Sequence, residues 1–308
     1  MDKEGVLVVG SANMDMVVTV DRFPFPGETI FGKKYRTYPG GKGANQAVAC
    51  AKLGVRTYFI GKFGDDDFCE TLTNSMRNVG VNLNNIFIDK EENTGTALIT
   101  IDKEGQNKII VISGSNMKLS LSDIESQRML FGHVKIVLAQ LEIPLDTVLK
   151  TAELSKKEGA IFILNPAPAQ QLPDELLHRI DFLTPNEIEL EQISGIKVSD
   201  EESAGKAALD LINRGVRNVI VTLGSNGSLL VNKNEIKKFP AIEVQAVDTT
   251  GAGDSFNGAF AFSLAKGNDM EKSVKFANKV ASICVTRMGA QSSMPFYNEV
   301  ELFENQLI

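Results

Sequence analysis

The residues best suited to chemistry lie at positions 247–258, with the sequence VDTTGAGDSFNG. Two glycines, Gly251 and Gly253, precede the acidic residue Asp254. If a helix begins here, its first backbone amides lack intrahelical partners and carry partial positive charge, so they bind phosphate or a developing oxyanion. The segment therefore predicts an anion-binding turn with one carboxylate beside it.

Asp254 has two interpretations. Aspartate is a favoured residue at helix starts, so it can act as a helix cap and nothing more. Alternatively, its carboxylate accepts the proton of a substrate hydroxyl, while the amides of Ala252, Gly253 and Asp254 neutralise a transferring phosphoryl group. The local sequence leaves both open, and the rest of the chain favours the second.

The elements on either side of the turn must position it. Apolar and polar residues alternate from 242 to 246, which predicts a half-buried strand before the turn. A helical apolar stripe covers residues 256–264 and ends near Gly267, a residue typical of helix C-termini. We therefore expect a strand, a glycine turn and a helix start around Asp254.

Composition and charge limit the class of protein. The 308 residues are 43% hydrophobic and 23% charged, as expected of a globular protein with a sizeable core. The net charge of -7 argues against nucleic acid or an anionic membrane as the main partner. No apolar run approaches the roughly 20 residues of a membrane span. The sequence predicts a soluble cytoplasmic protein.

Cysteine and histidine usage excludes several kinds of site. Cys50, Cys69 and Cys284 are widely spaced and form no C-x-x-C pair, which predicts buried or half-buried free thiols in a reducing compartment. The chain contains two histidines. With so few histidines, a histidine metal site or a Ser-His-Asp triad is disfavoured.

Buried strands and helices alternate along the chain. Apolar runs predict strands at 6–10, 56–61, 134–141, 161–165, 181–184 and 218–223, and helical patterns cover segments such as 146–157 and 201–214. This alternation predicts an α/β fold with a doubly wound, mostly parallel sheet and helices on both faces. Polar residues follow these strands, among them Gln140, Asn165 and Asn186, and in such a fold they share one rim where ligands bind.

Two segments, at about 14–38 and 94–113, contain strand patterns outside this rhythm. Residues 102–107 have the composition of a hairpin connection. We expect one domain over residues 1–308, with these strands inserted as a small accessory sheet. Such a sheet can cover a crevice or pair with another subunit.

A second glycine cluster, PGGKGANQA at 39–47, precedes an apolar helical stretch. Its spacing does not match G-x-x-x-x-G-K-[ST], so it is not a Walker phosphate loop. Gly41 and Gly43 permit a close backbone approach, and Lys42 and Asn45 are donors, which suits a small polyhydroxylated ligand. The alternative is that the glycines serve tight helix packing and Lys42 is solvated.

Two polar pairs also have two interpretations each. Asn13 and Asp15 follow the first strand and are either turn formers or ligand-binding residues at the rim. Asn186 and Glu189 lie three residues apart at a predicted helix start. They either form a capping box or face phosphate and its hydrated Mg²⁺, which prefers oxygen ligands.

With these motifs in hand, the chain resembles the ribokinase-like (PfkB) carbohydrate kinases. The similarity covers essentially the whole chain, and GAGD at 251–254, the cluster at 40–46, NEIE at 186–189 and the turn at 224–227 occur in the family's order and spacing. The resemblance implies a three-layer α/β domain with a β-sheet lid. It also implies transfer of the ATP γ-phosphoryl to the 5-hydroxyl of D-ribose, and a homodimer formed through the lids.

The resemblance assigns roles to individual residues. It implies that Asp254 is the general base in a catalytic turn with Gly251, Ala252 and Gly253. The residues implied to hold the sugar are Asn13, Asp15, Gly41, Lys42, Gly43, Asn45 and Glu142. Those implied for the ATP site are Asn186, Glu189, Thr222, Gly224, Ser225, Gly227, Gly253 and Asn278, with Glu189 near Mg²⁺. A monovalent cation, usually K⁺, would use Asp248, Thr250, Cys284, Arg287, Gly289 and Ser293, mostly through backbone oxygens.

Other activities stay open at this point. The runner-up is a kinase for deoxyribose, fructose or a nucleoside, because the sequence does not show which residue faces C2 of the sugar. Carboxylates at Asp15 and Glu142 disfavour an acceptor that already carries phosphate. A catalytically silent sugar- or nucleotide-binding regulator is a further alternative, against which the presence of Asp254 and both flanking glycines counts.

Overall fold

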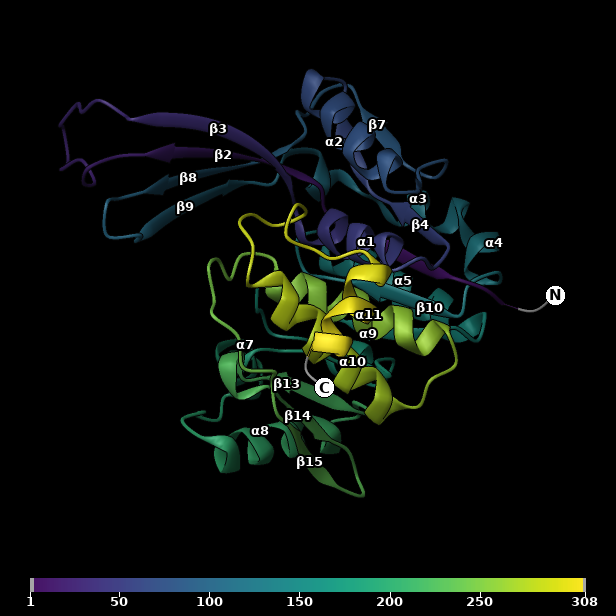
Figure 1. Ribbon diagram of the computed structural model, residues 1–308. Coiled ribbons are helices and arrows are strands. Elements are labelled where there is room, and N and C mark those ends of the chain that lie inside the picture. The colour runs from purple at the N-terminus through teal and green to yellow at the C-terminus, as the bar shows by residue number, and fades with distance from the viewer. Residues whose placement is uncertain (1–2, 307–308) are drawn as a thin grey trace.

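The computed structural model describes residues 3–306, and their largest sheet has nine strands (Figure 1). The strands are β1 (Val6–Val9), β4 (Thr57–Ile60), β6 (Val81–Asn82), β10 (Ile136–Ala139), β11 (Ile161–Leu164), β12 (Phe182–Leu183), β13 (Val219–Thr222), β14 (Ser228–Val231) and β15 (Ile236–Phe239). Their order is β15-β14-β13-β12-β11-β10-β1-β4-β6. Neighbours from β6 to β13 are parallel, and β14 and β15 are added antiparallel at one edge.

Helices cover both faces of this sheet. One face carries α1 (Lys42–Lys52), α2 (Asp67–Asn78), α9 (Ala252–Ala265), α10 (Met270–Cys284) and α11 (Tyr297–Gln306); the other carries α3 (Leu121–Ser126), α4 (Arg128–Phe131), α5 (Leu145–Lys157), α6 (Asp174–Leu177), α7 (Glu187–Ser194) and α8 (Glu201–Asn213). Val6 and Val8 of β1 belong to the first core, whereas Leu7 and Val9 belong to the second. Because side chains alternate across a strand, one buried strand serves two cores. The predicted doubly wound α/β architecture is confirmed.

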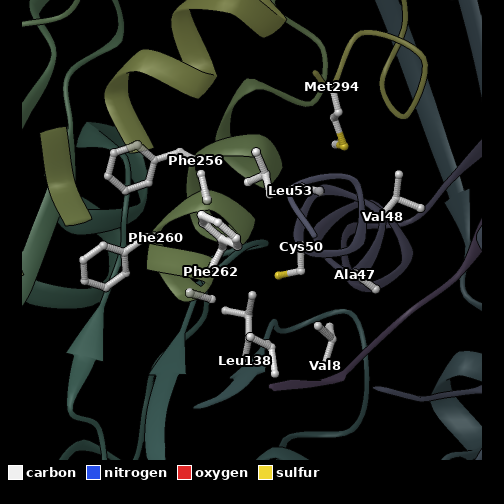
Figure 2. Packing of buried hydrophobic residues seen from close by; sticks show 14 of the residues in the cluster. Val8, Ala47, Val48, Cys50, Leu53, Leu138, Phe256, Phe260, Phe262 and Met294 are labelled. Carbon is white, nitrogen blue, oxygen red and sulfur yellow. The ribbon is translucent and has the colours of Figure 1, made fainter. Parts of the chain in front are cut away.

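The packing of α1 against α9 determines the geometry of the site. Figure 2 shows side chains of both helices meeting over Val8 and Leu138 of the sheet. Gly258 of α9 lies at their contact, where an added Cβ would come within 2.5 Å of Ala49 Cβ and 2.9 Å of the Gln46 carbonyl oxygen. The two helices approach this closely because position 258 has no side chain. Their first turns are thereby brought side by side.

A separate sheet of four strands has the order β3-β2-β8-β9. Its strands are β2 (Asn13–Thr19), β3 (Lys34–Gly40), β8 (Gly95–Ile101) and β9 (Asn107–Ile112). Figure 1 shows it extending away from the large sheet, and all six residues of β9 are exposed. This small sheet is the predicted accessory sheet, whereas the expectation of a single domain over 1–308 stays a prediction.

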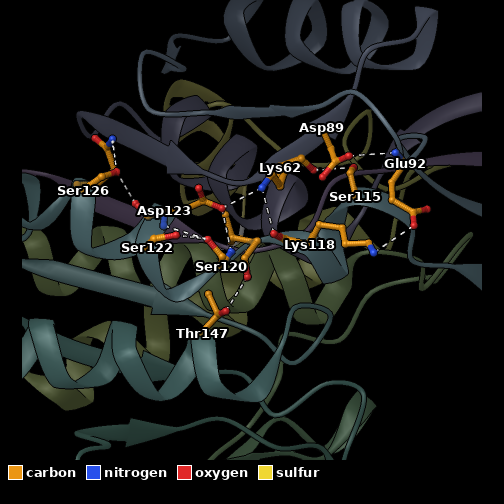
Figure 3. Close-up of polar contacts among 12 residues, drawn as sticks. Lys62, Asp89, Glu92, Ser115, Lys118, Ser120, Ser122, Asp123, Ser126 and Thr147 are labelled. Carbon is orange, nitrogen blue, oxygen red and sulfur yellow. Dashed lines mark hydrogen bonds and ion pairs between the residues drawn. The ribbon is translucent and has the colours of Figure 1, made fainter.

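Polar contacts hold the base of the small sheet (Figure 3). Lys62, in the short strand β5 (Lys62–Gly64) that pairs with β7 (Phe87–Asp89), donates to Asp123 Oδ2 and to the Lys118 carbonyl, both at 3.1 Å. Ser115, in the 3-10 helix η1 (Gly114–Lys118) that follows β9, donates to the Lys62 carbonyl at 2.9 Å. Lys118 also pairs with Glu92, just before β8, at 3.3 Å. Both connections of the β8–β9 hairpin are therefore attached to the main body.

The structure differs from the sequence predictions at two places. The predicted strand at 242–246 is wrong, because residues 240–249 contain no helix or strand. Ile242, Val244 and Ala246 line a cavity beside α10 instead, so their apolar character serves a cavity wall. Within the segment of strand patterns predicted at about 14–38, β2 ends at Thr19 and β3 begins only at Lys34. The six predicted buried strands are all present, and each is shorter than predicted by one or two residues at one end or at both ends.

The burial of the three cysteines and the character of the helices can be compared with the sequence predictions. Cys50 and Cys284 are buried and Cys69 is half-buried, each as a free thiol, as predicted. Within residues 3–306, none of the helices has the length and apolar character that crossing a bilayer requires.

Candidate active site

Asp254 lies in the first turn of α9 with its carboxylate turned toward α1. The helix starts after Gly251, whose φ of 77° is left-handed, and no side chain caps it. Asp254 is 8% exposed, and its Oδ2 and Oδ1 accept hydrogen bonds from Asn45 Nδ2 at 2.9 Å and Gln46 Nε2 at 3.0 Å. The interpretation of Asp254 as a helix cap is therefore wrong.

Burial and hydrogen bonding act on this carboxylate in opposite directions. Burial raises the pKa of Asp254 above its usual value, while the Lys42 ammonium and the donors on Asn45 and Gln46 act to lower it. The net effect is a raised pKa, which makes Asp254 a stronger proton acceptor than an exposed aspartate.

The backbone amides beside Asp254 are open. Among residues 3–306, the amides of Gly253 and Asp254 donate to no other group, whereas the Ala252 amide donates to the Thr249 carbonyl at 3.2 Å. An ideal Cβ on Gly253 would meet nothing within 4 Å. The anion-binding turn thus offers two free amides rather than the three that the sequence suggested.

The start of α1 is filled from within the protein. The Lys42 amide donates to Glu142 Oε2 at 3.1 Å, and the Gly43 amide donates to Ser11 Oγ at 3.3 Å. Ser11 Oγ in turn donates to the same Glu142 oxygen. A Cβ on Gly43 would lie 2.6 Å from the Ser11 nitrogen, so tight packing does explain this glycine. Ser11 is a site residue that the sequence analysis did not select.

Four carboxylates act electrostatically on the Lys42 ammonium. Burial raises the pKa of Asp15 to about 7, helped by the charges of Glu142 and Asp254 and opposed by Lys42. Burial acts to lower the pKa of Lys42, but Asp254, Glu142, Glu189 and Asp15 together raise it above its usual value. Lys42 is therefore the charge partner of an acidic site and not a freely solvated side chain.

Residues predicted for the sugar meet at the root of the small sheet. Gly41 has a φ of 85°, and a Cβ there would lie 2.5 Å from the Asn13 nitrogen. Asn13 is buried and its Oδ1 accepts from Asn116 Nδ2 at 2.7 Å. Asn45 Oδ1 is buried with no hydrogen-bond partner within the described chain. Asn116 is a second residue that sequence reasoning missed.

Two cavities adjoin the start of α9, with volumes of about 830 Å³ and about 210 Å³. The larger is lined by Asn186, Thr222, Gly224, Ser225, Gly227, Gly253 and Asn278 of the predicted ATP site, and by apolar residues such as Ile242 and Val285. The smaller is lined by Lys42, Glu189, Gly251 and Asp254 among others. Asn186, Thr222 and Gly253 line both, so the cavities meet at the start of α9.

Asn186 and Glu189 form the capping box of α7. Asn186 Oδ1 accepts from the Glu189 amide at 2.8 Å, and Glu189 Oε2 accepts from the Asn186 amide at 2.9 Å. The capping interpretation is confirmed, but it does not occupy the whole carboxylate. Within the described chain Glu189 Oε1 has no hydrogen bond, and burial raises the pKa of Glu189 against the effects of the Asn186 amide and Lys42.

The residues predicted for a monovalent cation lie in the loop before α9 and at the end of α10 and the loop after it, and these two segments contact each other. Asp248 Oδ1 accepts from the Thr250 amide at 2.9 Å, and its Oδ2 accepts from the Gly289 amide at 2.8 Å. Partial burial opposes these bonds, which nevertheless lower the pKa of Asp248. Cys284 Sγ and Ser293 Oγ are 3.0 Å apart. No group of three or more His, Cys, Asp or Glu side chains in the described part of the chain is arranged to hold a metal ion.

Comparison with protein families matches residues 3–296 to the pfkB family of carbohydrate kinases. The chain belongs to this family. This chain is similar to the ribokinase of Haemophilus influenzae. The two are 41% identical over 297 residues, which cover 96% of this chain and 97% of the relative. It is also 36% identical to the deoxyribokinase of Salmonella typhi over 303 residues, which cover 98% of each.

Solved structures agree with this membership. A structure of Arabidopsis thaliana ribokinase complexed with ribose and ATP superposes with a TM-score of 0.92 and 38% identity, covering 98% of both chains. The resemblance to the ribokinase-like kinases and the predicted fold class are therefore confirmed.

Proposed function

We propose that this protein is an ATP-dependent sugar kinase that transfers the γ-phosphoryl group of ATP to the 5-hydroxyl of D-ribose, giving D-ribose 5-phosphate and ADP. Family membership and similarity to ribokinases support the reaction class. One observation carries the assignment of the chemistry. The buried Asp254 carboxylate lines the smaller cavity, and the adjacent Gly253, which carries one of the two free amides, lines both cavities.

In the proposed complex, ATP occupies the larger cavity. Its volume of about 830 Å³ is within the range of small-molecule sites. The apolar wall that includes Ile242, Val244 and Val285 suits the adenine, beside Asn278. The polar end at Asn186, Thr222 and Gly253 suits the phosphates. The γ-phosphoryl group then reaches the junction with the smaller cavity.

The sugar occupies the opposite side of Asp254, against Asn13, Asp15, Gly41, Lys42, Gly43, Asn45 and Glu142. The unpartnered Asn45 Oδ1 and the carboxylates of Asp15 and Glu142 accept hydrogen bonds from the sugar hydroxyls, and Lys42 donates hydrogen bonds to them. A phosphorylated sugar would meet those carboxylates as a like charge, so the site favours a neutral acceptor.

Asp254 then accepts the proton of the 5-hydroxyl as that oxygen attacks phosphorus. The new bond joins O5 to the γ-phosphorus, the bond from this phosphorus to the bridging oxygen breaks, and ADP leaves. The amides of Gly253 and Asp254 stabilise the charge of the transferring group. A small sheet that closes over the site would exclude water, the competing acceptor.

The residues present fit two cations. Glu189 Oε1, which lacks a partner in the described chain, would hold a hydrated Mg²⁺ that neutralises phosphate charge. Among residues 3–306 the carbonyls of Thr250, Arg287 and Gly289 accept no hydrogen bond, which suits K⁺ beside Asp248 and Ser293. The Cys284 carbonyl accepts the Arg287 amide at 3.2 Å and is the weakest of the proposed ligands.

A second candidate is phosphorylation of 2-deoxy-D-ribose. The 36% identity to a deoxyribokinase favours it over other acceptors. No described residue is shown to face C2 of a sugar, so an assay must decide between the two.

The test is ADP release at saturating Mg-ATP with D-ribose, 2-deoxy-D-ribose, D-fructose and adenosine, each with and without K⁺. We expect ribose to be preferred and K⁺ to stimulate. In Asp254→Asn, we expect kcat to fall by about 10³-fold while ribose binding changes little, because the base acts mainly in the transition state. Near-normal turnover of this variant would remove the base assignment, and silence with all four acceptors would favour a binding protein.

We also propose a homodimer formed through the small sheets. Ile109, Ile110, Val111 and Ile112 of β9 are between 46% and 64% exposed, an apolar strip that a second copy would cover. Sedimentation velocity should give twice the monomer mass of 33.5 kDa, and Ile110→Lys should halve it. A wild-type monomer at assay concentration would refute the dimer.

A further inference from the structure

A network of amide side chains holds the Asp254 carboxylate from behind. Gln46 in α1 donates from Nε2 to Asp254 Oδ1 at 3.0 Å and to Asn165 Oδ1 at 3.1 Å. Gln46 Oε1 accepts from Gln140 Nε2 at 2.5 Å. Asn165 follows β11 and Gln140 follows β10, so the network joins two strand ends to α1 and α9. Gln46 is fully buried, and its position in α1 is otherwise typical of the core.

The orientation of each amide follows from one backbone carbonyl. The Thr184 carbonyl can only accept, so Asn165 must present Nδ2 to it, at 3.0 Å, and Oδ1 to Gln46. Gln46 must then present its NH₂ group to Asn165 and to Asp254. A rotated Gln46 amide would place its oxygen against two other oxygens. The network therefore always offers Asp254 a donor on this side.

Thr184 is also connected to the glycine turn that carries the free amides. Its Oγ1 donates to Asn257 Oδ1 at 2.6 Å, and Asn257 Nδ2 donates to the Gly253 carbonyl at 2.9 Å. The residue after β12 thus supports both parts of the start of α9, the carboxylate through Asn165 and Gln46 and the glycine turn through Asn257.

We propose that Gln46 is a positioning residue that fixes the Asp254 carboxylate in its working orientation, with its own amide oriented by Asn165. This inference rests on the proposed role of Asp254 as the base. Asn45 holds Oδ2 from the side assigned to the sugar, and its Oδ1 is free for a ligand. Gln46 has both N–H groups and its carbonyl oxygen engaged within the protein, so its contribution is to Asp254 and not to substrate.

Two substitutions test the proposal. Gln46→Glu puts a carboxylate oxygen against Asp254 Oδ1, and Gln46→Met keeps the shape of the side chain while removing its donor and acceptor. Because a like charge and a lost donor both favour the protonated acid, the pKa of Asp254 rises in each variant. We expect kcat to fall by about 10²-fold in Gln46→Glu and by about 10-fold in Gln46→Met, with KM for the sugar within a few-fold.

The pH profile separates this role from a purely structural one. Asp254 must be ionised to accept a proton, so the acid limb of kcat should move to higher pH, by about one unit in Gln46→Glu and by less in Gln46→Met. The neutral Met variant decides the matter if the Glu variant does not fold by circular dichroism. Wild-type kcat and an unmoved acid limb in the folded variants would overturn the proposal.

Two comparisons complete the experiment. Asn218→Asp changes another buried amide, one that donates to the Asp181 carbonyl at 2.9 Å and lines neither cavity, and should leave both kcat and the pH profile unchanged. Asp254→Asn is measured in parallel. If it is inactive while the Gln46 variants are normal, only the positioning role fails. If it is active, the base assignment fails instead.

Discussion

The starts of α1 and α9 share their backbone geometry and differ in what occupies them. Each helix follows a glycine with left-handed φ, 85° at Gly41 and 77° at Gly251, and neither has a capping side chain. At α1 the carboxylate of Glu142 already accepts the Lys42 amide. At α9 the Ala252 amide donates to the Thr249 carbonyl, whereas the next two amides, of Gly253 and Asp254, donate to no group of the described chain and lie near the junction of two cavities.

This difference shows that a glycine-rich helix start does not by itself determine its ligand. The positive end of α1 is neutralised by a residue 100 positions away in the chain. An external anion has no place there, so α1 is left to bind neutral groups. The unoccupied end of α9 keeps its attraction for phosphate. In the proposed function, the glycine segment of α1 therefore binds the sugar and that of α9 binds the phosphoryl group.

The largest expected effect comes from making α9 resemble α1. Gly253→Asp would supply an internal carboxylate to the free amides and repel the phosphoryl group. We expect kcat/KM for ATP to fall by about 10³-fold, since a charge-stabilising site is lost and a like charge is added. Steady-state ADP release measures this.

Gly253→Ala is the matched control for the charge. A Cβ added at position 253 would meet no atom within 4 Å, and φ there is not left-handed, so alanine adds bulk without strain. Its loss should be far smaller than that of aspartate. Equal losses in the two variants would mean that bulk, and not charge, controls the site.

A smaller effect is expected from emptying α1. Glu142→Gln removes the carboxylate from the Lys42 amide and a sugar ligand, so the sugar KM should rise by about 10-fold. Inorganic phosphate should also become a competitor of the sugar, because the positive end of α1 is then uncompensated. Inhibition kinetics with phosphate checks this, and Glu153→Gln on the exposed face of α5 serves as control. Phosphate inhibition equal to that of the wild type would contradict the comparison.

We also expect Glu142→Gln to change the pH dependence of the sugar KM. The pKa of Asp15 is raised to about 7 by burial and by its acidic neighbours, so in the wild type the sugar KM should rise as pH falls through 7 and Asp15 becomes protonated. Removing the Glu142 charge lowers this pKa, so the rise in KM should begin at lower pH in Glu142→Gln. If the sugar KM rose at the same pH in both proteins, the Glu142 charge would not affect the pKa of Asp15.

The sequence was sufficient for the parts of the fold in which pattern and environment coincide. β1, β10 and β11 are continuous apolar runs because they are buried on both faces. The predicted strand at 242–246 is absent for a physical reason. Apolar residues alternate with polar ones both in a half-buried strand and in this irregular segment, where they line the wall of a cavity. The antiparallel strands β14 and β15, of which β15 lies at the edge of the sheet, were not predicted, although the glycine turn at 224–227 directly precedes β14.

The site was predictable where chemistry is concentrated in a short motif, as at Gly251 to Asp254. It was not predictable where partners come from distant parts of the chain. Gln46 lies 208 residues from Asp254 and 119 from Asn165, and no local pattern relates them. The available signal was a glutamine within an otherwise apolar helix face, because a buried amide must find partners.

One contact at the far end of α1 has a consequence for linkage between ligands. Lys52 donates to the carbonyls of Gln291 and Met294, at 2.8 and 2.9 Å, in the loop that also contains Gly289 and Ser293. About 15 Å of helix separates it from Lys42 at the proposed sugar site. If a cation in that loop changes the position of α1, it changes sugar affinity by some factor, and the sugar must change cation affinity by the same factor. Titrating either ligand in the presence of the other would measure one coupling free energy from both directions.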